Sequence, residues 1–305
     1  MIGRNRRDRR KGAVFGGVAA VAVGLLGVML VAIASADPPQ TVGGVTYRHD
    51  SVPANPPALA IAEVKCPGAT HASGGGSTSE SGTKGRLQMS APVDGADSDR
   101  IPGDIWRARH AYSPGDGAET QNVYVICLGE SLTYMSRTTV LHPGQAGAVT
   151  VSCGRTRHVT GGGAALSRTS AAGFVNSSYP VDSGDAGAAP DDGWSVRAFN
   201  GSAADMRVRV NAMCSNTART YRSGAQTIAP GTANFAHASC PDAQHVVGLG
   251  AKVSGRAKDA PLTSVSNGDG ADADFIPDDN TNAGAAISSG APIGSTLTAF
   301  AICRS

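Results

Sequence analysis

Residues 153–163 read CGRTRHVTGGG, and related stretches stand at 66–76, CPGATHASGGG, and at 240–250, CPDAQHVVGLG. Their cysteines lie 87 residues apart. Other identical residues keep that spacing: Tyr47, Tyr134 and Tyr221; Pro56, Pro143 and Pro230; His71, His158 and His245. A fixed period of this size indicates tandem repeats or a body built from one repeated unit. We therefore expect a leader, a short linker and three repeats, at 1–36, 37–45, 46–127, 130–214 and 217–303.

The composition after residue 36 is poor in residues that favour surface helices. Only four lysines and four glutamates occur there, whereas the turn formers Gly, Asp, Ser and Pro are abundant. Short alternating runs such as AVTVSC (148–153) and MRVRVNAMC (206–214) predict strands. The sequence thus predicts an all-β protein of three tandem, antiparallel, β-sandwich-like repeats of about 87 residues, each with one disulfide. The alternative is a single pseudo-threefold body similar to a β-prism.

The glycine-rich stretch of each repeat is expected to be structural. Glycines in a strand remove side chains where another backbone passes close or where the strand bulges. A phosphate-binding loop would need a strand-to-helix context and a following Lys with Ser or Thr, and these are missing. The stretch HVTGGGAAL (158–166) therefore predicts close packing of a strand.

All six cysteines lie after residue 36 and none forms a CxxC pair, so structural disulfides are expected rather than metal or redox chemistry. Two pairing schemes respect the repeat. One closes each repeat on itself: Cys66 with Cys127, Cys153 with Cys214, and Cys240 with Cys303. The other joins neighbours: Cys127 with Cys153, Cys214 with Cys240, and Cys66 with Cys303. We favour the first, because a repeat of this size has a small core and gains most from its own crosslink.

The first 36 residues are expected to direct export. Six cationic side chains precede an uncharged run, 13–36, that ends in Ala-Ser-Ala before Asp37. This pattern predicts a signal peptide cleaved after Ala36. The run is also long enough to remain as a membrane anchor, which is the alternative. Without the leader, 20 cationic and 23 anionic side chains give a net charge of −3, and no cluster of cations indicates nucleic-acid binding.

The repeats resemble secreted bacterial repeat proteins whose unit reads Cys-Pro, then Gly-Gly-Gly, Ser-x-Pro, Gly-Trp, Asn and a closing Ala-Ile-Cys. Here the second copy carries GGG, SYP, DGW, FN and AMC, and the third carries CP and AIC but has Thr281 in place of Trp. The resemblance covers all three repeats and implies no particular activity. A more distant likeness, through CP, G and DDNTN (278–282), is to the three-repeat β-prism of the vitelline membrane outer layer type.

Two tryptophans are candidate ligand-binding residues, because a flat indole suits the apolar face of a sugar ring. Trp106 and Trp194 are the only tryptophans of the chain. In WSVRAFN (194–200), however, the Trp shares one strand face with Val196 and Ala198. This alternation favours a core position over a binding platform.

The three equivalent histidines could bind zinc only if the repeats closed around an axis that His71, His158 and His245 all face. The interpretation that we favour is one strand histidine copied with its repeat. A hydrolase site is no better marked, since the sequence has no GxSxG motif. Adjacent acids such as Asp191 and Asp192 would point to opposite faces of an extended chain.

Each repeat carries several aspartates in a loop downstream of its glycines, reading DGADSD at 94–99, DSGDAG at 182–187 and DGADAD at 269–274. Calcium takes six to eight oxygen ligands, which carboxylates on a flexible loop supply. The alternative is turn formation, because Asp side chains bond their own backbone. The predicted calcium ligands are Asp94, Asp97 and Asp99 in the first repeat and Asp269, Asp272, Asp274, Asp278 and Asp279 in the third.

Together these features predict an exported, non-catalytic binding or structural module of the cell envelope or the extracellular space. The expected partner is an envelope polysaccharide or another surface partner, and calcium is the candidate cofactor. Membrane contact is expected only through residues 13–36, if they are not cleaved. A secreted hydrolase with an active site built from loops is the alternative.

Overall fold

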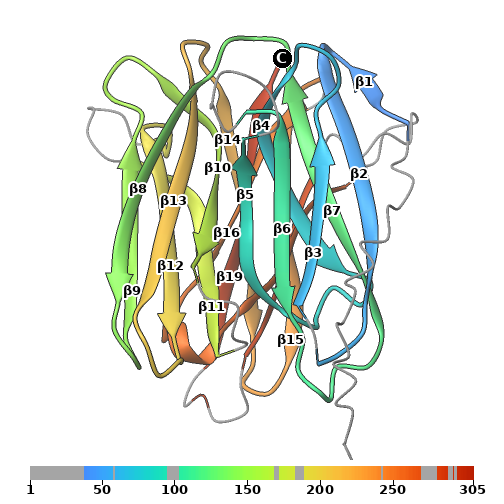
Figure 1. Ribbon diagram of the computed structural model, residues 1–305. Helices are drawn as coiled ribbons and strands as arrows, with labels where there is room; N and C mark the ends of the chain where they lie inside the picture. Colours follow the sequence, from blue (N-terminus) through green and yellow to red (C-terminus); the bar gives the residue numbers. More distant parts are fainter. Residues whose placement is uncertain are drawn as a thin grey trace, which may run out of the picture. The chain divides into compact units, whose positions relative to one another are not determined.

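The computed structural model describes residues 38–57, 59–94, 103–167, 172–182, 189–241, 243–268, 280–287, 291 and 294–305. They belong to one compact unit (Figure 1). Repeat 1 contributes β2 (Val45–Ala54), β3 (Leu59–Lys65), β4 (His71–Ser79), β5 (Arg86–Val93), β6 (Ile105–Ala111) and β7 (Glu119–Leu128), preceded by β1 (Gln40–Val42). Repeat 2 contributes β8 (Thr133–Leu141), β9 (Ala146–Ser152), β10 (His158–Leu166), β11 (Gly173–Val181), β12 (Gly193–Asn200) and β13 (Met206–Ser215). Repeat 3 contributes β14 (Thr220–Ile228), β15 (Ala233–Ser239), β16 (His245–Val253), β17 (Leu262–Gly268), β18 (Asn280–Ala286) and β19 (Ser295–Arg304), with a 3-10 turn at Ala257–Asp259.

Each repeat folds into two three-stranded antiparallel halves that pack against each other. In repeat 1, β2, β7 and β4 form one half, and β3, β6 and β5 form the other. Strand β3 buries Ala60, Ala62 and Val64, while the residues between them are exposed, as the two-residue period of a strand requires. Side chains from both halves form one core cluster that contains Val64, Trp106 and Val125. The predicted all-β class and sandwich-like repeat are confirmed.

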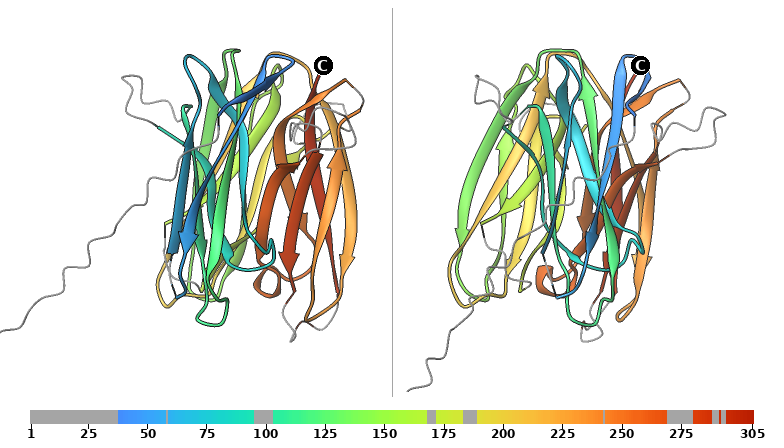
Figure 2. Two further views of the ribbon diagram at one scale, coloured as in Figure 1. Left: turned by 90° about the vertical axis from the view of Figure 1, so that its right-hand side faces the viewer. Right: turned by 45° about the vertical axis from the view of Figure 1, so that its right-hand side comes forward.

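The halves of different repeats join into three continuous sheets. Their strand orders are β1-β2-β7-β4-β17-β18-β15, β3-β6-β5-β10-β13-β8 and β14-β19-β16-β11-β12-β9. The joining pairs are Ser77 with Val265, Ser90 with Ala164, and Ser178 with Ala251. Figure 1 shows one such seam, where β5 and β10 lie side by side, and Figure 2 shows the strands of the three repeats lying roughly along one axis, with arrows pointing both ways. Each repeat shares a sheet with both others, so the sandwiches close into the pseudo-threefold body that the sequence offered as the alternative.

The first glycine of each motif lies where the third strands of the three repeats meet. A Cβ atom there would lie 2.8, 1.9 and 2.1 Å from a carbonyl oxygen of another repeat: Gly74 against Val247, Gly248 against Thr160, and Gly161 against Ser73. These contacts run from repeat 1 to 3, from 3 to 2 and from 2 to 1, so they form a ring around the pseudo-threefold axis. The close backbone approach is the predicted one, and the register shift between Ala72 and Gly74 is the predicted bulge.

The other two glycines of the motif have different neighbours. In repeat 2, a Cβ atom at Gly162 would lie 2.1 Å from Cδ2 of Trp194. A Cβ atom at Gly163 would lie 2.3 Å from the carbonyl oxygen of Ser90, across the seam between two repeats. The three consecutive glycines therefore serve the axis, the sandwich core and the sheet seam in turn.

Two rings of hydrogen bonds reinforce the closure. In the first ring a tyrosine hydroxyl donates to a carbonyl oxygen of another repeat at 2.7 to 2.9 Å: Tyr47 to Val246, Tyr134 to Ala72, and Tyr221 to Val159. Burial raises the pKa of Tyr221 well above its ordinary value, so its hydroxyl remains a donor. In the second ring a buried polar side chain donates to the next repeat at 2.7 to 3.0 Å: Gln88 to Gly173, Asn176 to Ala260, and Thr263 to Gly82.

The disulfides settle the choice between the two pairing schemes. Each repeat is closed on itself, by Cys66–Cys127, Cys153–Cys214 and Cys240–Cys303. The crosslinked residues are 61, 61 and 63 positions apart, a loop length for which the chain-entropy model gives a stabilisation of about 4 kcal/mol. The contacts between repeats are therefore non-covalent throughout.

Candidate functional site

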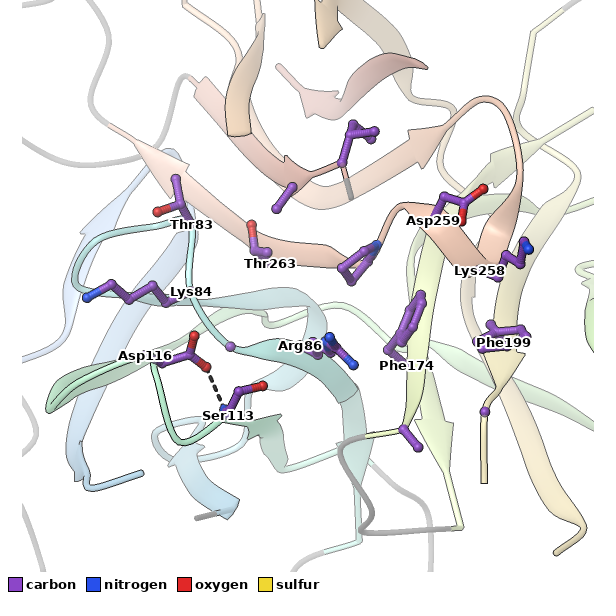
Figure 3. A pocket seen from close by; sticks show the side chains of 16 residues that line it. Thr83, Lys84, Arg86, Ser113, Asp116, Phe174, Phe199, Lys258, Asp259 and Thr263 are labelled. Carbon is purple, nitrogen blue, oxygen red and sulfur yellow. Dashed lines mark hydrogen bonds between the residues drawn. The ribbon is translucent and has the colours of Figure 1, made fainter. Parts of the chain in front are cut away.

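A pocket of about 450 Å³, here called the axial pocket, lies at the ends of strands from the three repeats (Figure 3). All three repeats line it. Repeat 1 contributes Thr83, Lys84, Gly85, Arg86, Ser113 and Asp116; repeat 2 contributes Ala172, Phe174, Phe199 and Gly201; repeat 3 contributes Lys258, Asp259, Pro261, Thr263, Ala286 and Ile287.

The side chains around the axial pocket do not follow the threefold pattern of the core. By strand register, Arg86, Phe174 and Pro261 occupy equivalent positions at the start of the fourth strand. The guanidinium carbon of Arg86 lies 5.6 Å from the ring centroid of Phe174, a cation–π distance. Phe174 in turn packs against Phe199, with ring centroids 5.6 Å apart. One pseudo-symmetric frame therefore carries one asymmetric pocket.

Charged groups of both signs line the axial pocket. Figure 3 places Phe199, Lys258 and Asp259 on the side of Phe174, and Lys84 and Asp116 on the opposite side. Lys84 forms a 2.8 Å ion pair with Glu119, and Asp116 accepts a hydrogen bond of 2.6 Å from the Ser113 amide. Arg86 and Lys258 are two further cations of the lining, which also contains the aromatic pair Phe174 and Phe199. Such a pocket suits a ligand with an anionic group and an apolar face.

The two predicted platform residues lie in the core instead. Trp106 and Trp194 are 0% exposed, and their indole nitrogens donate to Ser90 and Ser178 at 3.0 and 2.8 Å. An indole with no accessible face cannot stack on a sugar from solution. The alternation in WSVRAFN that favoured a core position is thus the better guide.

Repeat 3 shows what the core tryptophan requires. The strand registers make three sets of positions equivalent: Gly75, Gly162 and Leu249; Ser90, Ser178 and Val265; Trp106, Trp194 and Thr281. Where the indole is lost, the facing glycine becomes a leucine and the serine that accepts its hydrogen bond becomes a valine. All three replacements are buried. The trio is therefore a coupled packing unit and not a binding surface.

The predicted histidines have separate surroundings. Nδ1 of His158 lies 2.8 Å from Oδ2 of Asp191. The ring of His245 instead packs against the backbone of Gly43, where a Cβ atom would lie 2.4 Å from Cδ2 of the histidine. Within the described part of the chain, no group of three or more His, Cys, Asp or Glu side chains could hold a metal ion.

Most of the predicted calcium ligands lie outside the described residues. Only Asp94 is described, as an exposed residue at the end of a strand. Outside lie Asp97, Asp99, Asp269, Asp272, Asp274, Asp278 and Asp279, so calcium binding stays a prediction. The leader, 1–36, is also outside, and no helix among the residues described is long and apolar enough to cross a membrane.

One pair of polar residues was missed by the sequence analysis. Oγ of Ser77 lies 2.8 Å from Nε2 of His110, and both side chains are buried in the sandwich of repeat 1. Burial lowers the pKa of His110 to about 3, which makes it a weak base. The signal was present in the repeat itself, because Ala198 and Ala285 occupy the position of His110 in the other two copies.

No protein-family model matches the chain, and no curated protein matches it. The functional argument therefore rests on the residues and their geometry.

Proposed function

We propose that this protein is an exported, non-catalytic binding module whose ligand site is the axial pocket, and that the ligand is an anionic unit of an envelope polysaccharide. The observation that carries the proposal is the asymmetry of this pocket. Three repeats that keep the first glycine of the motif, the equivalent tyrosine and the disulfide supply Arg86, Phe174 and Pro261 at one equivalent position. A concave site whose lining differs from repeat to repeat is where a repeated frame is expected to hold a ligand.

The chemistry of the lining supports an acidic saccharide. Arg86 and Lys258 offer donors to a carboxylate, and Phe174 and Phe199 offer an apolar surface to a sugar ring. Asp259 and Thr263 supply polar groups that suit hydroxyls. The leader and the three disulfides support a site of action outside the cytoplasm.

A non-catalytic role fits the burial of the Ser77–His110 pair. Ser77 and His110 are 1% and 0% exposed, so a substrate has no access to the serine hydroxyl in this conformation. A histidine with a pKa near 3 is also a poor general base at neutral pH, because its ring binds a proton only weakly.

The test is binding of the purified protein to an array of acidic and neutral polysaccharides, followed by calorimetry with the best ligand. Arg86→Ala should weaken binding of an acidic glycan at least tenfold, since a hydrogen bond to a charged group contributes about 1.5–3 kcal/mol. Arg222→Ala is the matched control, because Arg222 is exposed on β14 outside the pocket. Equal affinity of both variants would overturn the assignment of the pocket, and release of shorter saccharides would favour the hydrolase.

A further inference from the structure

The interior of repeat 1 differs from the interiors of its two sister repeats. Its polar cluster, defined as Ser77, His110, Tyr112 and Gln121, is between 0 and 2% exposed. The strand registers assign apolar residues to three of the four positions in both other repeats: Ala164 and Ala251 for Ser77, Ala198 and Ala285 for His110, and Val208 and Leu297 for Gln121. The same sandwich is thus built twice without these polar groups, so the fold does not require them.

Three members of the polar cluster lie on three strands of repeat 1, and Tyr112 directly follows one of these strands. Ser77 on β4 contacts His110 on β6 at 2.8 Å, and the rings of His110 and Tyr112 stack with centroids 6.1 Å apart. Gln121 on β7 pairs with Ser79, the next inward residue of β4 after Ser77. The cluster therefore occupies one end of the repeat 1 core.

Several polar atoms of the cluster are buried without a partner among the described residues: Nδ1 of His110, the hydroxyl of Tyr112, and both Oε1 and Nε2 of Gln121. Leaving a buried donor or acceptor unpaired costs about 1–3 kcal/mol. Native proteins satisfy such groups with ordered water or a ligand when the protein offers no partner. Four such atoms on three buried residues of one sandwich core call for hydrogen-bond partners other than the described side chains.

We propose that the polar cluster is a buried binding site for a neutral hydroxyl group, supplied by water or by a small polyol, held between His110, Tyr112 and Gln121. A hydroxyl both donates and accepts, which matches an amide that offers donors and an acceptor beside a phenol and an imidazole. The ligand is neutral because the charges at this end of the repeat are already engaged: Glu119 pairs with Lys84, and Asp116 accepts from the Ser113 amide.

The site lies directly behind the axial pocket. A Cβ atom at Gly85, a residue of the pocket lining, would lie 2.9 Å from the ring of Tyr112 and 3.2 Å from Nδ1 of His110. Gly85 thus belongs to the pocket lining and adjoins the polar cluster. The inference does not depend on the proposed function, since it concerns a separate set of residues and a neutral ligand.

The test is a crystal structure at high resolution, from crystals grown without polyols and from the same crystals soaked in glycerol. We expect density for a water or a glycerol hydroxyl within hydrogen-bond distance of at least two of the three groups, His110 Nδ1, Tyr112 Oη and the Gln121 amide. The interior of repeat 2 around Ala198 is the control in the same crystal and should be dry. Water in the unsoaked crystal and glycerol in the soaked one would both support the site and would identify the source. Direct bonds among the cluster side chains with no intervening density would overturn it.

A second measurement uses a variant that copies repeat 2. Ser77→Ala/His110→Ala/Gln121→Val should remove the bound molecule. In the unaltered protein, magnetisation transfer in NMR should connect the Gln121 side-chain amide to a long-lived water, and the variant should lose any such water from this core. Absence of this transfer in the unaltered protein would count against the site even if the variant does not fold.

Discussion

Exchanging the core trio of repeat 2 for that of repeat 3 tests whether tryptophan, glycine and serine form one coupled unit. The triple variant is Gly162→Leu/Ser178→Val/Trp194→Thr. Each change alone leaves a misfit: a Cβ at Gly162 would lie 2.1 Å from Cδ2 of Trp194, and the indole N–H donates to Ser178 at 2.8 Å. The sandwich of repeat 3, which has the same strand arrangement, contains all three replacements together: Leu249, Val265 and Thr281.

The magnitudes follow from the contacts that each single change removes or forces. Trp194→Thr should cost about 3–5 kcal/mol, because it empties a fully buried position. Gly162→Leu should cost about 1–3 kcal/mol or more through overpacking against the ring. Ser178→Val should cost about 1–3 kcal/mol by leaving the indole N–H without an acceptor. If the three residues are coupled, the triple variant should lie within about 2 kcal/mol of the unaltered protein, far below the sum of the single changes.

The assay is urea unfolding with the disulfides intact, followed by the fluorescence of Trp106, which remains when Trp194 is replaced. The free energies of unfolding of the single variants, the triple variant and the unaltered protein complete the cycle. The equivalent exchange in repeat 1, at Gly75, Ser90 and Trp106, gives a second cycle, followed there by Trp194. Additive costs in both cycles would refute the coupling.

Three further predictions concern the frame. Replacing Cys153 and Cys214 by serine should lower the free energy of unfolding by about 4 kcal/mol, measured by urea denaturation, and non-reducing peptide mapping should recover this pair in the unaltered protein. The pKa of His110 is about 3 in the folded protein and about 6.5 in the unfolded chain, so between these pH values the unfolded chain binds one more proton. The free energy of unfolding should therefore fall by up to about 5 kcal/mol as the pH drops from 6.5 to 3. His110→Ala should reduce this dependence of the free energy of unfolding on pH. Tyr134→Phe should cost about 1–3 kcal/mol, because the Ala72 carbonyl loses a 2.9 Å hydrogen bond from another repeat; an unchanged denaturation midpoint would remove this bond from the closure.

The repeat, its strand content and its packing requirements can be read from the order of the residues alone. The 87-residue spacing of Cys66, Cys153 and Cys240 defined three equivalent units, and alternating runs marked their strands. Consecutive glycines predicted close backbone approach because a strand position without a side chain has few other uses. These features are local or periodic, so they can be recognised in the sequence without knowing which strands pair in the fold.

The partners of those residues, by contrast, depend on how the three repeats fold against one another. The choice between two disulfide schemes required Cα separations of 5.6 to 5.7 Å within each repeat. The axial pocket combines Arg86 and Phe174 from different repeats, and no spacing along the chain places a guanidinium 5.6 Å from that ring. The polar cluster likewise depends on Gln121 and His110 facing one interior from opposite halves of a sandwich. A repeated sequence specifies equivalent strands, but the closure of three sandwiches around an axis is a long-range event, and it alone determines where equivalent positions converge and where their differences form a site.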